Sequence, residues 1–180
     1  MKKNEILIGS PRRNGNTFIL SNHLNDLLNS EGAHSYLSYL YDYEIKPCID
    51  CRVCKSGNMK CSIKDEASKL FDKIENADVI VFATPIYWFG PTAKTKLLID
   101  RLRPYFTNKK LFGKKGAVIL SAGSGITDCD LTIEMFKRIF TTLGIEYIDT
   151  ITAEAYDIGD VVENEIALDS VLMLSKNILK

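Results

Sequence analysis

The sequence predicts a doubly wound α/β fold, in which five parallel strands form one sheet with helices on both faces. Apolar runs of strand length alternate along the chain with amphipathic segments of helix length. Such alternation favours a parallel sheet with right-handed crossovers. In a sheet of order 2-1-3-4-5, ligands bind beyond the carboxyl ends of the strands, where the strand order reverses. The loops after strands one, three and four bound that crevice, and they are the unusual loops of this sequence.

The expected strands are short runs rich in apolar residues. They cover residues 6–8, 36–41, 79–83, 116–121 and 146–152. The run at 79–83 is apolar at every position, which is typical of a central strand covered on both faces.

The expected helices carry apolar residues at helical spacing. They cover residues 17–30, a segment starting at 65–66, and residues 93–102, 130–143 and about 161–179. Glu31-Gly32 and Gly144 follow the first and fourth of these segments and act as stop signals. Asp65 and Glu66 place negative charge at a helix start, where the helix dipole favours it.

Composition limits the class of protein. The chain has 180 residues, which predicts a single domain over 1–180 that buries roughly 70% of the surface its unfolded chain exposes. Its 23 basic and 23 acidic side chains cancel, which argues against nucleic acid or an anionic membrane as a partner. The apolar run near Met1 is too short for a signal peptide, and no run has the length of a membrane span. We therefore expect a cytoplasmic protein.

The first unusual loop follows the strand at 6–8 and leads into a helix at Thr17. A loop between a strand and a helix presents free backbone N–H groups at the positive end of the helix dipole, where phosphate binds. Ser10, Asn16 and Thr17 add polar donors, while Arg12 and Arg13 add charge. The segment lacks the P-loop and dinucleotide-binding patterns and contains no cysteine nucleophile. It is therefore interpreted as an anchor for the phosphate of a mononucleotide cofactor, although an ordinary turn has a similar composition.

Two further loops have compositions that suit a planar ligand. The loop expected at 84–91 is dense in aromatic residues and contains Pro85, Ile86, Tyr87, Trp88 and Phe89. Such side chains favour a platform for a flat ring, or alternatively contacts in a dimer interface. Ala122, Gly123, Ser124 and Gly125 follow the fourth strand and would let the backbone approach a ring edge. By itself this last segment is equally typical of a turn.

Three segments together resemble the flavodoxin-like NAD(P)H-dependent FMN reductase family: Gly9 to Thr17, Thr84 to Gly90, and Lys96 to Leu102. The cysteine pattern resembles its iron–sulfur flavoprotein branch. The resemblance implies that the FMN phosphate is held by Ser10, Arg12, Asn14, Asn16 and Thr17. It also implies that residues 85–89 and 122–125 flank the isoalloxazine ring. Homodimers or homotetramers are implied too, with the helix at 96–102 in the subunit contact.

Four of the five cysteines lie in a long loop expected at about 44–64. Two residues separate Cys48 from Cys51 and Cys51 from Cys54, and six separate Cys54 from Cys61. Four thiolates at this spacing can hold a four-iron, four-sulfur cluster, and similar patterns in iron–sulfur flavoproteins place one near the flavin. Zinc and free thiols without metal are the alternatives. A disulfide framework is not expected in a reducing compartment.

The remaining chemically capable side chains are assigned structural roles. His23 and His34 have no partners nearby in the sequence, and Cys129 is outside the cysteine pattern. The acids at 157, 160, 163 and 165 are interpreted as a solvated loop and a helix start. No Ser-His-Asp or paired-carboxylate pattern is visible, in keeping with chemistry carried by a cofactor.

The expected function is therefore that of an FMN-binding oxidoreductase. NAD(P)H would deliver a hydride, and electrons would pass to flavin, a quinone, a nitro-type compound or a redox protein. One alternative is an electron carrier with FMN and a cluster but little nicotinamide turnover. Another is a zinc-stabilised binding module without flavin.

Overall fold

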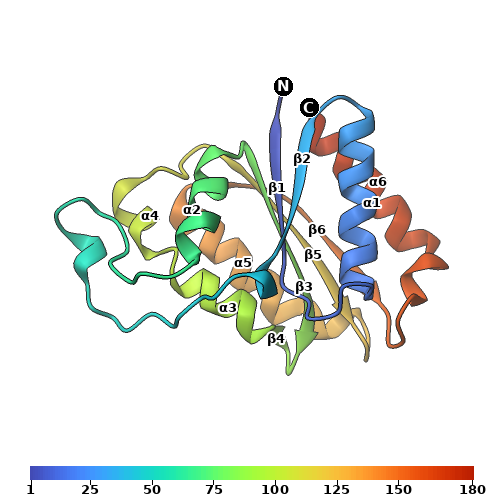
Figure 1. Cartoon of the computed structure of the whole chain (residues 1–180). Helices are drawn as coiled ribbons and strands as arrows, with labels where there is room; N and C mark the ends of the chain where they lie inside the picture. The colour runs from blue at the N-terminus through green and yellow to red at the C-terminus, as the bar shows by residue number, and fades with distance from the viewer.

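The computed structural model describes residues 1–180, and its centre is one twisted parallel sheet (Figure 1). Its strands are β1 (Lys3–Ile8), β2 (His34–Tyr39), β3 (Val79–Tyr87), β5 (Lys115–Ala122) and β6 (Glu146–Glu154). They run in the order β2-β1-β3-β5-β6, and every neighbouring pair is parallel. The two-residue strand β4 (Gly90–Pro91) pairs antiparallel with the end of β3. The five long strands therefore confirm the predicted order 2-1-3-4-5.

Helices cover both faces of this sheet. They are α1 (Asn16–Ser30), α2 (Ala67–Asn76), α3 (Ala93–Asp100), α4 (Arg103–Asn108), α5 (Asp130–Leu143) and α6 (Glu165–Leu179). Figure 1 shows α1 and α6 on one side of the strands and α2 to α5 on the other. Short 3-10 turns cover Leu40–Asp42, Val53–Lys55, Ile126–Cys129 and Asp160–Val162.

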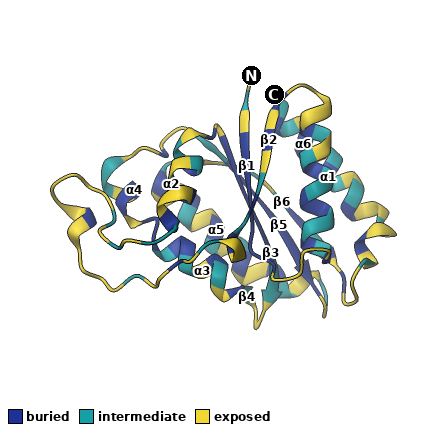
Figure 2. Ribbon diagram, viewed as in Figure 1, coloured by how far each residue is buried: buried dark blue, intermediate teal, exposed yellow.

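The apolar core is divided by the sheet. A cluster of 22 buried residues lies on the α2–α5 side and includes Leu7, Phe82 and Phe136, while 19 lie on the α1–α6 side, among them Ile6 and Val81. Successive residues of β1 and β3 thus point to opposite clusters, as the period of a strand requires. Both faces are covered to a similar extent, which explains the nearly continuous apolar runs of the central strands. In Figure 2 these strands are mostly dark blue.

The segment at 84–91 corrects one expectation. Its first four residues continue β3 to Tyr87 instead of forming a loop, and only Trp88 and Phe89 form the turn to β4. Both turn residues have positive φ, 50° and 62°, as a two-residue hairpin turn of the favoured hand needs. The Thr84 hydroxyl accepts from the Thr92 amide, which ties the hairpin to the start of α3.

Two expected helices differ at their ends. The helix expected at 93–102 ends at Asp100, and α4 follows it after a short turn because Pro104 fits only the first turn of a new helix. The last helix begins at Glu165 instead of 161, because Asn164 caps it by accepting from the Ala167 amide.

The segment between β2 and α2 contains only two 3-10 turns. Most of residues 46–64 are exposed, and Figure 2 draws this long loop largely in yellow at the edge of the molecule. No helix of the chain combines the length and the apolar character needed to cross a membrane.

Candidate functional site

A cleft of about 570 Å³ lies at the carboxyl ends of the strands, where the order reverses. Two of the predicted loops line it, those after β1 and β5, and the third predicted segment lines it as the end of strand β3, at residues 85–87. A fourth segment follows β6. The lining residues are Ser10, Arg12, Gly15, Asn16, Thr17, Pro85, Ile86, Tyr87, Ser121, Gly123, Ser124, Ala155, Tyr156, Asp157 and Ile158.

The first turn of α1 opens into this cleft without a cap. Gly15 occupies the N-cap position, no side chain bonds to the first turn, and no acidic residue lies in it. The first N–H groups of a helix have no partner within the helix, and the dipole makes this end positive. Every other long helix has an acid or a polar cap at or near its start: Asp65 for α2, Thr92 for α3, Asp130 for α5 and Asn164 for α6. The α1 terminus is therefore the one arranged to accept an anion.

The hydroxyl groups predicted for this loop are buried and held in place. Ser10 is 4% exposed, and its Oγ accepts from the Arg12 amide at 3.2 Å. Thr17 is 1% exposed and shares a hydrogen bond of 2.8 Å with the Ser121 hydroxyl. This bond joins the first turn of α1 to the end of β5.

Asn16 has a different role from the one predicted. Its side-chain Nδ2 donates to the Asp157 carbonyl at 2.7 Å, and its Oδ1 accepts from the Gly159 amide at 2.9 Å. The amide is therefore occupied by the loop after β6 and fixes that loop against the start of α1. Asn14 is exposed and is not among the residues that line the cleft.

Gly9 fixes the path of the loop after β1. Its amide donates to the Ala83 carbonyl, and its carbonyl accepts from the Thr92 hydroxyl at 2.6 Å. A Cβ at position 9 would lie 1.8 Å from the Thr95 Oγ1, so any side chain there collides with the start of α3. Glycine is thus required for a close approach between backbone and helix.

The aromatic hairpin is divided between the cleft and the outer surface. Pro85, Ile86 and Tyr87 line the cleft, whereas Trp88 and Phe89 do not. Trp88 is 95% exposed at the tip of the turn. The Phe89 carbonyl accepts from the Thr132 hydroxyl, which attaches the hairpin to α5.

The segment after β5 is divided in the same way. Gly123 and Ser124 line the cleft, while Ala122 is buried at the end of β5 and its carbonyl accepts from the Ala155 amide. Gly125 has a φ of 127° and turns the chain away from the cleft.

The loop after β6 was not predicted as part of the site. Tyr156 contributes an aromatic ring that is 77% exposed, and the amides of Tyr156 and Asp157 both donate to the Asp160 carboxylate. A Cβ at Gly123 would lie 3.1 Å from the Tyr156 ring, so the two loops touch. The sequence feature that could have identified this loop is an aromatic residue in a Gly- and Asp-containing turn after a strand. Because all parallel strands end at the same edge of the sheet, such a turn lies beside the other loops of the cleft.

The four cysteines of the long loop line one narrow cavity. Cys48, Cys51, Cys54 and Cys61 are all free thiols, and the space between them is about 10 Å³, room for about one water molecule. The Cys51 thiol lies 3.3 Å from the Ser62 hydroxyl, and this contact with nearby backbone N–H groups lowers its pKa. No three Cys, His, Asp or Glu side chains have the arrangement of a metal site. The predicted ligands are therefore gathered together, but not in ligand geometry.

Arg101 anchors this cysteine loop to the end of α3, a role that sequence reasoning missed. Its side chain is 1% exposed and pairs with Asp65, whose side chain is fully buried. The guanidinium also donates to the carbonyls of Lys46 and Ile63 and to the Cys61 sulfur at 3.3 Å. Burial raises the pKa of Asp65, but hydrogen bonds from Arg101 and the Lys46 amide outweigh burial and hold it below its ordinary value.

Among the side chains assigned structural roles, Cys129, His23 and His34 do not line the cleft, whereas Asp157 does. Cys129 is fully buried, and burial raises its pKa to about 11. His23 lies on α1 and His34 is the exposed first residue of β2.

The chain matches the family model described as NADPH-dependent FMN reductase over residues 3–155. An iron–sulfur flavoprotein from Methanocaldococcus jannaschii is 33% identical over 132 residues, which cover 73% of this chain and 68% of the relative. A Bacillus subtilis protein, provisionally described as an NAD(P)H-dependent FMN-containing oxidoreductase, is 30% identical over 180 residues and 95% of both chains.

Solved structures show the same fold. An FMN-dependent NADH-azoreductase from Bacillus anthracis superposes with a TM-score of 0.74 at 20% identity, covering 99% of this chain and 100% of the other. The Trp repressor binding protein from Bacillus subtilis gives 0.72 at 23% identity, with 96% and 99% covered. The flavodoxin-like fold and the expected class of FMN-binding oxidoreductase are thus confirmed, because the chain belongs to the NADPH-dependent FMN reductase family.

Proposed function

We propose that the chain binds FMN in the cleft at the carboxyl ends of the strands and uses NAD(P)H to reduce a small acceptor such as a flavin, a quinone or a nitro-type compound. The observation that carries this assignment is the uncapped, acid-free start of α1 at one end of a cleft of about 570 Å³. A mononucleotide needs an anion site joined to a slot for a flat ring, and this cleft offers both.

The donor set fits the phosphate of FMN. The first turn of α1 has no side-chain cap and lines the cleft, as do Ser10 and Thr17, which supply hydroxyl groups. Arg12 supplies positive charge at the rim. Asn16 acts indirectly, by holding the loop after β6 in place.

The opposite part of the cleft fits a ring system. Ile86 and Tyr87 provide apolar surface on one side, and Gly123 allows the chain to approach closely on another. Tyr156 provides a further aromatic ring on the loop after β6.

The protein residues bind and orient, and none is placed as an acid or base. When bound, FMN supplies the hydride and single-electron chemistry. The Thr17–Ser121 bond and the Asn16 contacts hold the start of α1, the end of β5 and the loop after β6 together around the cleft. Pro85 to Tyr87 lie on a paired strand, so the ring-facing side chains have a fixed position.

The assignment is tested by measuring FMN retention. Ser10→Ala and Thr17→Ala should each weaken FMN binding by about tenfold, which corresponds to the loss of one hydrogen bond to a charged group. Thr17→Ser should bind FMN as the wild type does, because it keeps the hydroxyl. Ser30→Ala, at the far end of α1, is the control for general effects on the helix. Undiminished FMN content in both variants would contradict the placement of the phosphate.

We further propose that the cysteine loop holds a four-iron, four-sulfur cluster. Four free thiols line one cavity, and the relative from Methanocaldococcus jannaschii is named an iron–sulfur flavoprotein. The thiolate donor set fits a cluster, while the small volume of the cavity that the cysteines line requires the exposed loop to open around it. Such a protein could act as an electron carrier with little nicotinamide turnover.

Anaerobic purification with iron, sulfide and zinc analysis distinguishes the alternatives for this loop. We expect about four irons and four sulfides per chain and an absorbance that Cys54→Ser removes, with Cys129→Ser as the control. One zinc per chain, or no metal, would contradict the cluster. Bleaching of the flavin by NADH or NADPH in stopped flow separates the reductase from the carrier.

We also propose that the chain forms homodimers or homotetramers through the surface around α3 and α4. An apolar groove of about 550 Å³ there includes Leu102, Phe106 and Ile139, and Phe106 is 57% exposed. Light scattering after size exclusion should give a mass of two or four chains, and Phe106→Glu should reduce it to one. A monomeric wild type would contradict this proposal.

A further inference from the structure

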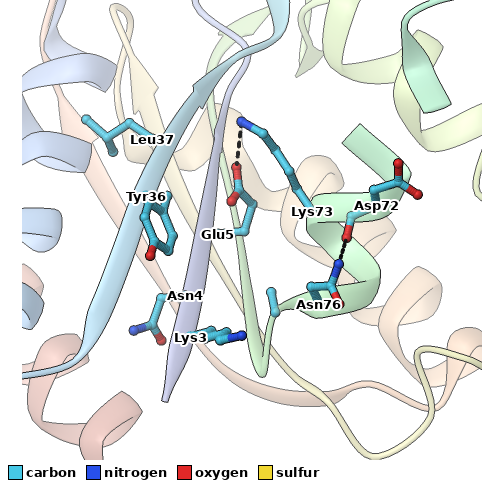
Figure 3. Close-up of a pocket in the computed structure, with 9 residues that line it drawn as sticks. Lys3, Asn4, Glu5, Tyr36, Leu37, Asp72, Lys73 and Asn76 are labelled. Carbon is cyan, nitrogen blue, oxygen red and sulfur yellow. Dashed lines mark hydrogen bonds and ion pairs between the residues drawn. The ribbon is translucent and has the colours of Figure 1, made fainter. Parts of the chain in front are cut away.

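A second groove lies on the α2 side of the sheet, near the amino ends of the strands (Figure 3). Its volume is about 650 Å³, comparable with that of the FMN cleft. We call it the β2–α2 groove, and it is lined by Lys3, Asn4, Glu5, Tyr36, Leu37, Asp72, Lys73, Asn76 and Ala77. It shares no residue with the cleft at the carboxyl ends.

The groove exists because α2 leaves part of the edge strand uncovered. β2 is at the end of the strand order, and Tyr36 pairs in register with Glu5 on β1. Register partners on parallel strands share a face, so both side chains lie on the α2 side. The Tyr36 ring is 54% exposed, whereas Glu5 is 4% exposed at the floor.

Glu5 is a buried carboxylate that lacks one partner. Its Oε1 accepts no hydrogen bond, and the nearest cation, the Lys73 Nζ, is 4.0 Å away. The Lys73 Nζ instead donates to the Ser38 hydroxyl at 2.7 Å. Figure 3 shows the Glu5 and Lys73 side chains directed toward each other across the groove. A buried acceptor without a hydrogen-bond donor destabilises the folded state.

Side-chain packing at position 5 does not require a carboxylate, so it does not offset this destabilisation. Leu7, the next residue of β1 on the same face, belongs to the apolar core, and a leucine or methionine at position 5 would remove the orphan acceptor. Unsatisfied buried groups of this kind in a native structure call for an explanation, and a ligand that donates to the free oxygen is one.

The surroundings of Glu5 restrict the ligand. A free carboxylate oxygen needs an N–H or O–H donor, and the face of Tyr36 suits a flat ring. The charges of Lys3 and Lys73 balance those of Glu5 and Asp72 around the groove, so the site favours a ligand without net charge. Asp72 disfavours an acid close to the α2 wall.

We propose that the β2–α2 groove binds a neutral, flat, amino-substituted nitrogen heterocycle, whose amino group donates to the Glu5 Oε1 while its ring packs against Tyr36. The site is independent of FMN and would be a second small-molecule site on the opposite edge of the sheet. Its volume accommodates one bicyclic ring of the aminopurine type.

The proposal is tested with adenine and cytosine as probes and the FMN-loaded full chain as target. Amide NMR spectra should shift at Glu5, Tyr36 and Lys73 with a dissociation constant of about 1 mM or tighter. Benzamidine, a flat cation, and benzoate, a flat acid, are the comparison probes and should bind at least about tenfold more weakly.

Two variants separate binding from folding. Glu5→Met should abolish adenine binding while leaving the fold at least as stable, because it removes the orphan acceptor. Tyr36→Ala should weaken binding by about tenfold through loss of the ring contact. Glu31→Met, an exposed acid at the end of α1, is the matched control. The FMN content of all three should equal that of the wild type.

The proposal is overturned if neither adenine nor cytosine shifts the groove residues, or if the Glu5→Met variant binds them as well as the wild type does. Tighter binding of benzamidine than of adenine would overturn the ligand class. A change in flavin content would instead count against the separation of the two sites.

Discussion

At the residue scale, the buried Arg101–Asp65 pair and the buried Glu5 carboxylate differ in how completely they are hydrogen-bonded. Arg101 and Asp65 are both buried, and the guanidinium donates to both Asp65 oxygens and to three acceptors on the cysteine loop, among them the Cys61 sulfur. Glu5 is buried with one oxygen unpaired. A fully bonded ion pair is expensive to break, whereas an incompletely bonded carboxylate is expensive to keep.

The first residue-scale prediction concerns pH. Burial raises the pKa of Glu5 above its ordinary value of 4.5, although Ser38 and Lys73 partly oppose it. A carboxyl with a raised pKa in the folded state favours folding below its unfolded pKa and loses that contribution as pH rises through the folded value. Glu5→Gln should therefore raise the free energy of unfolding by about 1–2 kcal/mol near pH 7, and by less near pH 4. Urea titrations at both pH values measure the difference, and an equal gain at both would refute the assignment.

The second residue-scale prediction concerns Arg101. Arg101→Met leaves Asp65 buried without a partner and should lower the free energy of unfolding by about 3–5 kcal/mol. Asp65→Leu added to this variant should restore most of the loss, because the remaining charge is removed with it. Denaturant unfolding of the two single variants and the double variant gives the coupling, and strictly additive effects would exclude a direct pair.

At the element scale, the site depends on where loops meet more than on the helices and strands themselves. Elements with strong periodicity, such as α5 at Asp130–Leu143, agree with the sequence to the residue. The end of β3 does not, because its pairing with β4 is a tertiary contact that continues the strand through Pro85. The α3–α4 break depends on Pro104, whose position is visible in the sequence but whose effect was not predicted.

Gly9 provides the element-scale prediction. A Cβ there would lie 1.8 Å from the buried Thr95 Oγ1, so Gly9→Ala must separate the end of β1 from the start of α3. We expect a loss of about 1–3 kcal/mol in unfolding free energy. We also expect weaker FMN retention, since the loop after β1, which is proposed to hold the phosphate, moves with Gly9. Gly32→Ala is the comparison for backbone strain without collision. Its φ of 80° is unfavourable for alanine, but nothing lies within 4 Å of the added Cβ. Normal FMN retention in Gly9→Ala would show that the loop tolerates the shift.

At the scale of the whole molecule, cavities of small-molecule size lie at both the carboxyl ends and the amino ends of the strands. The cleft proposed for FMN gathers the end of β3 and the loops after β1, β5 and β6, and the β2–α2 groove opens near the amino ends of β1 and β2. The first arises from the reversal of strand order, and the second arises from an edge strand that its neighbouring helix does not cover.

Cofactor linkage gives the prediction at this scale. A ligand that binds only the folded state stabilises it by mass action, so free FMN at about one hundred times its dissociation constant should add about 2.7 kcal/mol to the unfolding free energy. Thermal melts with and without FMN measure this shift. Thr17→Ala should show a smaller increase at the same FMN concentration, while Ser30→Ala should match the wild type. An equal increase in both variants would mean that FMN is held elsewhere.

The sequence by itself determined the strand order, the layers and three of the four segments around the cleft, because periodicity and glycine-rich turns act locally. It also identified the cysteine loop and the hydroxyls of Ser10 and Thr17. Tertiary structure alone decided that Asn16 braces the loop after β6, that Tyr156 joins the cleft, and that Arg101 anchors the cysteine loop. It also decided that Glu5, in a strand that the sequence predicted only from Ile6 onward, lies buried with a free oxygen. These features arise from contacts between residues far apart in the chain, and such contacts leave no periodic signal in the sequence.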